Sequence, residues 1–319
     1  MSAILTNRFL FSHHYLERIY QEADDKTEAA QLVADLRGWA SGWDDSSLSS
    51  LIGTQVGPTL VSLGFNYQDP SDGEDPHLVR LYTSYRKENQ VGLCYVAHRQ
   101  DGEADLDSTI KGRHYAAQII HALKEEELSW GLLTDGERWR LYHADELAPY
   151  ETFLEIDLGQ LLRDRGGAGR GDTAYLLHTL FTKSAFEVDE DGECALDRHL
   201  TASEKEASAI EKHLSDCIED VLRDLCQGFV EHDGRETYTS DQRDEVFRNA
   251  TVLLYRLLFI LYAEARDLLP LEVPEYHSAS LDALVEQAAQ YVKVTGLPDP
   301  DGTELWQNLS DLCSWVNSG

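Results

Sequence analysis

The sequence predicts an α/β domain followed by an all-helical domain, and three observations support this prediction. Residues Ser129–Tyr142 (SWGLLTDGERWRLY) have the pattern of two strands joined by a tight two-residue turn at Asp135-Gly136. Two further strand-like stretches, Leu78–Tyr85 and Val91–His98, precede this hairpin. Beyond residue 198 the apolar residues recur three and four positions apart, which is the spacing of helices.

The first domain should begin with helices and continue with the sheet. Ser12 is a good N-cap for the first helix, and Gly64 is placed to end the third. The expected helices are His13–Glu22, Asp24–Ala40, Leu48–Leu63 and Gly112–Glu126, and an edge strand is expected at Thr152–Leu158 after the hairpin. This gives the order helix, strands, helix, hairpin, with one strand fewer than a full α-β-β-β-α-β unit.

The second domain should consist of helices alone. We place the boundary between residues 186 and 187, at the acidic turn EVDEDGE, so that the domains are 1–186 and 187–319. The expected helices are Tyr175–Phe186 before the boundary, then Ser203–Val230, Ser240–Leu268, Ser280–Val294 and Glu304–Val316. Because the segment Val252–Leu261 is almost continuously apolar, we expect its helix to run through the middle of a bundle.

Composition indicates a globular protein with an unusual charge. The 319 residues are 42% hydrophobic, and 58 acidic against 27 basic residues give a net charge of −31. No apolar run approaches the roughly 20 residues that cross a bilayer, and no leader sequence is evident, so we expect a cytoplasmic protein without a membrane partner. None of the five cysteines has the spacing of a zinc site, which favours reduced thiols and no metal.

The acidic balance is opposite to that of most DNA-binding proteins, which neutralise phosphates with basic side chains. Three interpretations remain open. Dispersed acid with only eight lysines suits a halophilic organism, because molar salt shortens the screening length to about 3 Å. The chain could instead dock a protein partner, or it could be a DNA mimic that presents carboxylates at phosphate-like spacing.

The hairpin and the downstream segment Tyr255–Pro270 (YRLLFILYAEARDLLP) carry a resemblance to a known family. Together they resemble the N-terminal region of type IIG restriction enzymes and of the BREX and DISARM adenine-specific DNA methyltransferases, over roughly residues 1–290. The resemblance implies a PD-(D/E)XK nuclease-like domain joined to a helical domain. Structural roles are implied for the residues that match its pattern: Gln118, Trp130, Trp139, Arg256 and Glu264.

The nuclease chemistry of that family requires an Asp and a Glu-x-Lys on neighbouring strands, where the carboxylates hold Mg²⁺. At the corresponding positions this chain has His77, Val96 and His98. An isopropyl group cannot coordinate a cation, so we expect a catalytically inactive nuclease fold. A rescue through Asp75 would require a shifted register, and Glu88 or Glu103 could supply the second carboxylate only from a loop.

Methyltransferase motifs are absent from this sequence. It has no Gly-rich turn after a strand for S-adenosylmethionine and no Asn-Pro-Pro-Tyr to hold a flipped adenine. The sequence therefore predicts no cofactor in this chain and a noncatalytic module that works with, or is truncated from, an adenine-specific DNA methyltransferase. That parent or partner would bind S-adenosylmethionine, and the other expected partners are subunits of a restriction–modification or phage-defence system.

Two alternative functions stay open. One is an active Mg²⁺-dependent DNA nuclease whose site has migrated, and the other is an acidic DNA-mimic inhibitor. DNA contact would fall to the one Gly/Arg-rich segment, RDRGGAGRGD, through Arg163, Arg165 and Arg170. A solvent-exposed loop without DNA contact is the other interpretation of that segment.

Overall fold

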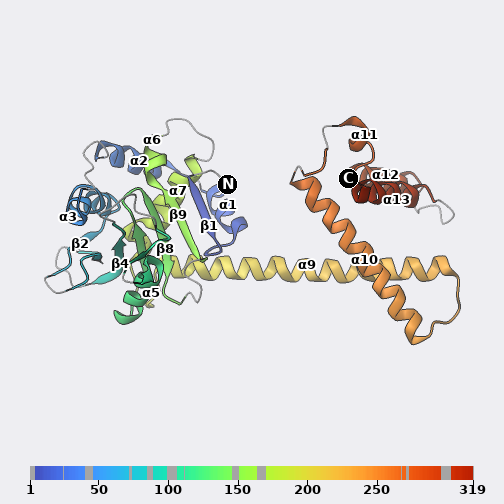
Figure 1. Ribbon diagram of the computed structural model, residues 1–319, viewed down its shortest axis with the longest axis horizontal. Coiled ribbons are helices and arrows are strands. Elements are labelled where there is room, and N and C mark those ends of the chain that lie inside the picture. Colours follow the sequence, from blue (N-terminus) through green and yellow to red (C-terminus); the bar gives the residue numbers. More distant parts are fainter. Residues whose placement is uncertain are drawn as a thin grey trace. The chain divides into compact units, whose positions relative to one another are not determined.

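The computed structural model describes residues 4–23, 25–39, 46–71, 74–84, 89–98, 106–110, 112–145, 151–163, 170–266, 268–270, 273–295 and 303–318. The chain divides into two compact units, Met1–Ile210 and Glu211–Gly319 (Figure 1). The first unit contains a large sheet with helices, and the second is helical. The expected order of an α/β domain followed by helices is therefore confirmed.

A seven-stranded mixed sheet forms the centre of the first unit. Its described strands follow the order β1-β9-β8-β7-β4-β3-β2, and among them only β4 and β7 run parallel to each other. The strands are β1 (Leu5–Arg8), β2 (Asn66–Gln68), β3 (Leu78–Tyr82), β4 (Gln90–Val96), β7 (Trp130–Thr134), β8 (Arg138–His143) and β9 (Phe153–Asp157). A separate small hairpin pairs β5 (Thr109–Ile110) with β6 (Arg113–His114).

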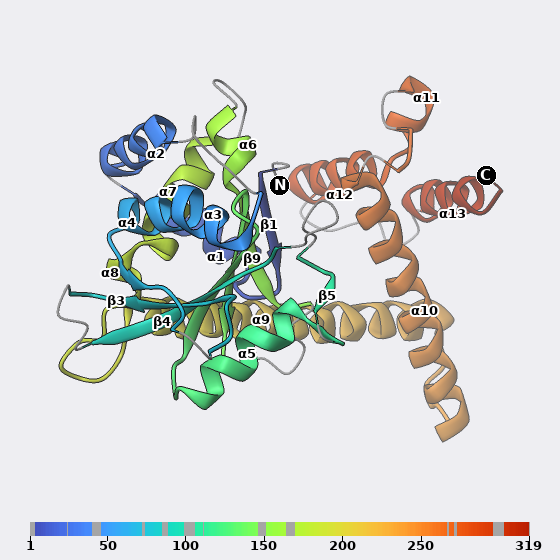
Figure 2. The ribbon, with the colours of Figure 1, turned by 60° about the vertical axis from the view of Figure 1, so that its left-hand side comes forward.

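Helices cover both faces of this sheet, so its central strands are buried on both sides. Helix α5 (Tyr115–Glu125) covers one face, and the remaining helices of the unit pack on the other (Figure 2). Those helices are α1 (His13–Gln21), α2 (Thr27–Trp39), α3 (Leu48–Leu51), α4 (Gly57–Ser62), α6 (Leu158–Arg163), α7 (Arg170–Phe181) and α8 (Lys183–Phe186). Side chains of β4 alternate between the two cores, with Tyr95 in one and Val96 in the other.

Local signals in the sequence explain the helix ends. The Ser12 side chain accepts a hydrogen bond from the Tyr15 amide, as an N-cap should. The helix predicted over Leu48–Leu63 is present, but its middle, Ile52–Val56, is a π-helical turn (η2) between α3 and α4. Gly64 ends α4 with a φ of +90°, which only glycine adopts easily.

The hairpin is present, but its turn is longer than predicted. Thr134 pairs with Trp139, so four residues rather than two connect the paired positions. Gly136 has a φ of +95°, which confirms that a left-handed residue is needed in this turn. The two-residue prediction was wrong because the Asp135 side chain accepts hydrogen bonds from the Glu137 and Arg138 amides and so stabilises a wider loop.

The strand predicted at the sheet edge, β9, lies inside the sheet instead. It pairs with β8 on one side and with β1 on the other, and β1 is the true edge strand. The short segment Leu5–Arg8 has too little alternation to be recognised as a strand. Strand β2, which pairs with β3, was also not predicted.

The second unit consists of helices, as predicted. Among its described residues it contains the C-terminal part of α9 (Ala195–Asp233), which spans the division between the units, and four more helices. These are α10 (Ser240–Ala265), α11 (Pro274–His277), α12 (Leu281–Thr295) and α13 (Glu304–Ser318). A small core brings together Ile260, Tyr276, Leu281, Leu284 and Leu312.

Helix α10 does not run through the middle of a bundle, contrary to the prediction. Tyr255 is 70% exposed and Phe259 is 61% exposed, because only one side of α10 packs on the other helices of its unit. The stretch Ser240–Glu264 is also long and apolar enough to cross a membrane by length and composition. The apolar content was recognised from the sequence, but it does not reveal what covers the helix.

Candidate functional site

The positions that the sequence analysis singled out meet at one edge of the sheet. The parallel strands β4 and β7 end side by side there, and the Ala97 amide donates to the Thr134 carbonyl over 2.7 Å. The antiparallel strand β3 begins at the same edge, where the Val96 amide donates to the His77 carbonyl over 2.8 Å. Carboxyl ends of neighbouring parallel strands are a frequent place for ligand sites in α/β sheets.

His77 is held in place by its surroundings. Its side chain is 8% exposed, and Nδ1 lies 2.7 Å from the main-chain carbonyl oxygen of Val96. The imidazole stacks on the Tyr95 ring with 5.6 Å between centroids and an interplanar angle of 5°. A carbonyl oxygen can only accept, so Nδ1 carries the proton in this contact.

Asp75 lies at the same edge and is also engaged. Its Oδ1 accepts from the His77 amide at 3.1 Å, and its Oδ2 accepts from the Tyr95 hydroxyl at 2.8 Å. Burial, and next the hydrogen bond to Asp75, raise the pKa of Tyr95 far above its ordinary value. The Tyr95 hydroxyl therefore remains a proton donor to Asp75 over the whole physiological pH range.

The two remaining positions of the implied metal site hold no carboxylate. Val96 is fully buried in the larger apolar core. His98 is half-buried, and its carbonyl oxygen accepts from the Tyr115 hydroxyl over 3.2 Å. Within the described ranges, no group of three His, Cys, Asp or Glu side chains could hold a metal ion. The rescue candidates Glu88 and Glu103 lie outside those ranges.

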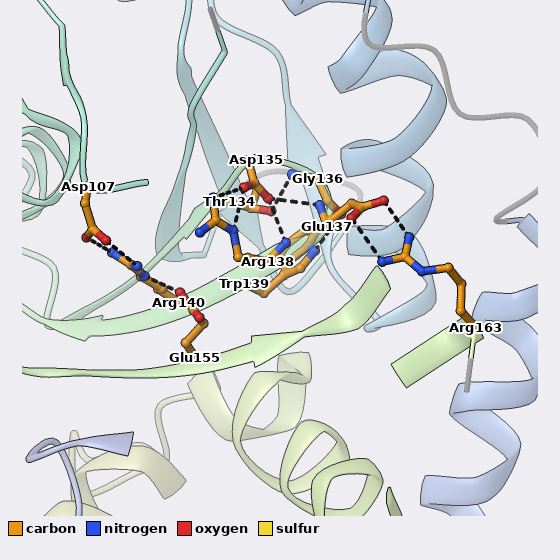
Figure 3. A network of polar contacts seen from close by, with 10 residues as sticks. All are labelled: Asp107, Thr134, Asp135, Gly136, Glu137, Arg138, Trp139, Arg140, Glu155 and Arg163. Atoms are coloured by element: carbon orange, nitrogen blue, oxygen red, sulfur yellow. Dashed lines mark hydrogen bonds and ion pairs between the residues drawn. The ribbon is translucent and has the colours of Figure 1, made fainter. Parts of the chain in front are cut away.

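The hairpin turn borders this edge and contains a dense polar network (Figure 3). Asp135 accepts hydrogen bonds from the main-chain amides of Glu137 and Arg138. It also pairs with the Arg138 guanidinium, with 2.8 Å between Oδ2 and Nη2. Burial raises the pKa of the Asp135 carboxyl, while the hydrogen bonds from Arg138 oppose that rise. Trp139 Nε1 donates to the Gly136 carbonyl at 3.1 Å, which joins the turn to the second strand of the hairpin.

The turn also packs closely against the π-helical segment. A Cβ atom added to Gly136 would lie 2.6 Å from the Gln55 side chain. Gln55 itself is 4% exposed, and its buried Nε2 has no hydrogen-bond partner within the part of the chain that the structure describes. A π-turn in a helix is often found near functional positions, and here it brings Gln55 to the turn.

A buried arginine that the sequence analysis missed lies on β8. Arg140 is 4% exposed and pairs with Asp107 at 2.6 Å and with Glu155 at 2.5 Å (Figure 3). Its guanidinium also lies over the Phe153 ring, 4.1 Å from the centroid. A guanidinium held between two carboxylates and over an aromatic ring is typical of a structural ion-pair cluster.

The structure describes two of the three proposed DNA-contacting arginines, Arg163 and Arg170. Arg163 ends α6 and pairs with Glu137 across distances of 2.8 and 3.3 Å. Arg170 begins α7, and Arg165 lies outside the described residues. Arg163 is therefore already neutralised by a carboxylate.

The implied structural residues have different environments. Trp130 is buried and its Nε1 donates to Asp197 of α9 at 2.8 Å, and Trp139 is buried in the same core. Gln118 is half-buried on α5. In the second unit, Glu264 is 5% exposed and accepts hydrogen bonds from Tyr276 and from the Leu281 amide, whereas Arg256 is exposed.

Comparisons with models of protein families, with curated proteins and with solved structures returned no match to this chain. Its function is therefore inferred from its own residues and their geometry.

Proposed function

We propose that this protein is a noncatalytic assembly or DNA-engagement module of a restriction–modification or phage-defence system. It would act in the cytoplasm beside an adenine-specific DNA methyltransferase, either as a separate subunit or as part of a longer parent chain. S-adenosylmethionine would belong to that methyltransferase. One observation supports the proposal: the positions that the resemblance assigns to a nuclease metal site lie at one sheet edge, and they hold His77, Val96 and His98.

The order of elements supports a nuclease-like origin for the first unit. The resemblance leads us to expect an α-β-β-β-α-β unit. Helix α4, strands β2, β3 and β4, helix α5 and strand β7 occur in that order, with the small β5–β6 hairpin inserted before α5. Strand β2 supplies the strand that the sequence left unresolved. Many unrelated folds share parts of such an order, so this observation supports the fold and not an activity.

The chemistry of the edge argues against Mg²⁺ binding. Mg²⁺ prefers carboxylate oxygens and water in near-octahedral geometry. The Val96 isopropyl group offers no lone pair, and the Asp75 carboxylate is committed to Tyr95 and to the His77 amide. A cation placed here would lie near the Asp75 carboxylate, which already accepts two hydrogen bonds, and near the His77 ring, whose Nδ1 contacts the Val96 carbonyl oxygen.

The charge of the chain favours assembly over DNA engagement. A net charge of −31 repels the phosphate backbone, and the DNA-contact candidate Arg163 is paired with Glu137. A protein partner with a basic surface would instead be attracted over distances up to the screening length.

Affinity capture of the tagged chain from its host, followed by mass spectrometry, tests the proposal. The lysate should be treated with a nonspecific nuclease, so that DNA does not bridge unrelated proteins. We expect an adenine-specific DNA methyltransferase or a helicase-like defence protein to co-purify. Recovery of no such protein, in repeated captures with the tag at either end, would refute the assembly role.

A further inference from the structure

Strand β1 is an edge of the seven-stranded sheet, next to β9 (Figure 1), and part of its main chain has no partner there. The Asp157 amide of β9 donates to the Ile4 carbonyl over 2.9 Å, so the main-chain groups of Ile4 face β9. Hydrogen-bonding groups alternate between the two sides of an antiparallel strand. The N–H and C=O groups of Leu5 and Asn7 therefore point away from β9, and no described strand pairs with β1 on that side.

The chemistry of this edge specifies what can pair with it. A row of alternating main-chain donors and acceptors is satisfied by another extended backbone, which adds a strand to the sheet. Natural edges are often protected by proline, by a bulge or by charged side chains. The pairing of β1 with β9 contains no bulge, and Leu5, Thr6 and Asn7 are neither proline nor charged. The edge is therefore suited to strand addition.

A second, independent feature lies at the end of β1. Phe9 has a φ of +57°, and its side chain is 84% exposed. The left-handed conformation is costly for an aromatic residue. The Asn7 side chain holds this turn, because its Nδ2 donates to the Phe11 carbonyl over 2.6 Å and its Oδ1 accepts from the Phe11 amide over 3.4 Å. Residues strained in this way cluster at functional positions, and an exposed ring beside an unpaired edge suits a contact surface.

The charge around β1 favours a contact between two copies of this acidic chain. No Asp or Glu occurs from Met1 to Leu16, although 58 of the 319 residues are acidic. The acid that lies opposite Thr6 on β9 is Glu155, and it is neutralised by Arg140. Two chains of net charge −31 repel each other where acids meet, so they approach most easily through a segment without acids.

Two β1 strands complement each other in one antiparallel register. With a two-fold axis at Thr6, Leu5 of each copy lies opposite Asn7 of the other, and each such pair exchanges two main-chain hydrogen bonds. Thr6 then faces Thr6 of the other copy, which is a favourable pair on a sheet. Arg8 lies opposite Ile4, and the two arginines stay about 14 Å apart, beyond the screening length of about 8 Å in physiological salt. An axis at Arg8 would instead place the two arginines opposite each other.

We propose that two copies of this chain associate through their β1 strands, antiparallel about Thr6, so that the two sheets become one continuous sheet. Phe9 of each copy packs beside the first residues of the other copy's strand. The two-fold symmetry closes the assembly at two copies. Because β1 has only four residues, the interface is small and the dimer depends on protein concentration.

Cysteine cross-linking of the full chain tests the register. Residues at position 6 form a pair without main-chain hydrogen bonds between them, where the Cα atoms lie about 4.5 Å apart, within reach of a disulfide. Thr6→Cys should form an intermolecular disulfide under mild oxidation, seen as a dimer on a nonreducing gel. Arg8→Cys is the matched control, because its Cα atoms stay about 14 Å apart in the same pairing. The wild type gives the background from the native thiols.

Sedimentation velocity tests the strength of the association, up to about 0.1 mM protein and in about 1 M NaCl, where repulsion is screened. We expect a dimer that forms with rising concentration. Leu5→Pro removes an outward N–H without removing a hydrogen bond to β9, so it should raise the dissociation constant at least about tenfold. Leu5→Val is the matched control, because it keeps the N–H and an apolar side chain, and it should leave the dissociation constant within about twofold.

Replacing the exposed ring separates this contact from a role in stability. Phe9→Gly removes the ring and also the cost of the left-handed conformation. We expect the dissociation constant to rise at least about tenfold while the melting temperature of the monomer is not lowered. A residue with only a structural role would show the opposite result, a lower melting temperature and an unchanged dimer.

Three outcomes would overturn the proposal. The first is a chain that stays monomeric at every concentration and salt, including one whose Leu5 and Asn7 amides become protected from hydrogen exchange only in the partner complex captured from the host, since a partner's strand would then occupy the edge. The second is equal cross-linking of Thr6→Cys and Arg8→Cys. The third is a dimer that Leu5→Pro and Phe9→Gly leave unchanged, because its contact would lie elsewhere on the chain.

Discussion

The hairpin turn favours glycine at position 136 for two reasons. Its φ of +95° is costly for any residue with a Cβ, and that Cβ would lie 2.6 Å from the Gln55 side chain. We expect Gly136→Ala to lower the free energy of unfolding by about 2–4 kcal/mol, measured by urea denaturation. Gly192→Ala is the matched control, because Gly192 has a φ of +85° with open space around it.

The control should cost only about 1 kcal/mol, which is the backbone strain alone. The difference between the two variants then reports the contact with Gln55. Equal losses in both would show that the turn does not pack on the π-helical segment as described.

The buried Arg140 cluster should contribute strongly to stability. Replacing Arg140 by Met leaves Glu155 without its cation in a partly buried site, and we expect a loss of about 3 kcal/mol in urea unfolding. Arg163→Met is the matched control, since its ion pair with Glu137 is exposed and should contribute less than about 1 kcal/mol. Similar losses in both variants would contradict the structural role given to Arg140.

The same cluster predicts a pH dependence. The hydrogen bond from Arg140 holds the pKa of the Asp107 carboxyl below its ordinary value. A carboxyl with a depressed folded pKa adds stability above its unfolded pKa, about 3.9, and loses that contribution as the pH falls through the folded pKa. As the pH falls below about 4, the free energy of unfolding should therefore decrease less steeply in Arg140→Met than in the wild type, because the variant has no Asp107–Arg140 pair to lose. Parallel acid profiles would contradict the pairing.

At the scale of secondary-structure elements, α9 is fixed to the α/β unit by its first turns. Asp197 caps the helix by accepting the Cys194 amide at 2.9 Å and also accepts Trp130 Nε1 at 2.8 Å. Further along, Tyr15 bonds His199, and the Ser12 amide donates to Ser203. These contacts join the start of α9 to the sheet and to α1.

We expect Asp197→Ala to destabilise the protein by about 1–2 kcal/mol, because both a helix cap and a partner for buried Trp130 are lost. Asp216→Ala, on an exposed stretch of the same helix, should change unfolding by less than about 0.5 kcal/mol. Thermal unfolding of the two variants checks this expectation. A neutral Asp197→Ala would show that α9 is attached mainly by its apolar contacts.

Local patterns predicted those elements that local interactions determine. The hairpin, the Ser12 cap and the helices after residue 198 follow from turn residues and from periodicity. The sequence did not reveal β1 or the inner position of β9, because both depend on pairing between Leu5–Arg8 and residues near 155. The predicted environment of α10 was also wrong, because the apolar content of a helix does not show which other element covers it.

The candidate site was predictable only in part, for a similar reason. Pairing of β3 with β4 brings His77 next to Val96, and the strand pattern was sufficient to expect this. Arg140 was missed because its partner carboxylates lie 33 and 15 residues away in the sequence. The contact between Gln55 and Gly136 also joins distant segments, and no local signal indicates it.

At the scale of the whole molecule, the net charge of −31 should make stability depend on salt. Raising NaCl from about 0.1 M to about 1 M shortens the screening length from about 10 Å to about 3 Å and so weakens repulsion among the acids. We expect the melting temperature to rise steadily over this range. A melting temperature that is unchanged or falls would count against the halophilic interpretation of the composition.

The proposed function requires that the sheet edge of the α/β unit, where the resemblance places a nuclease site, be unable to hold the metal ion of a nuclease. Incubation of the purified chain with supercoiled plasmid, in Mg²⁺ and separately in Mn²⁺, tests it most directly. We predict no nicking or linearisation above a buffer control, because Val96 and the engaged Asp75 cannot hold the metal. Metal-dependent cleavage that disappears in Asp75→Ala would contradict the claim and establish an active nuclease with a migrated site.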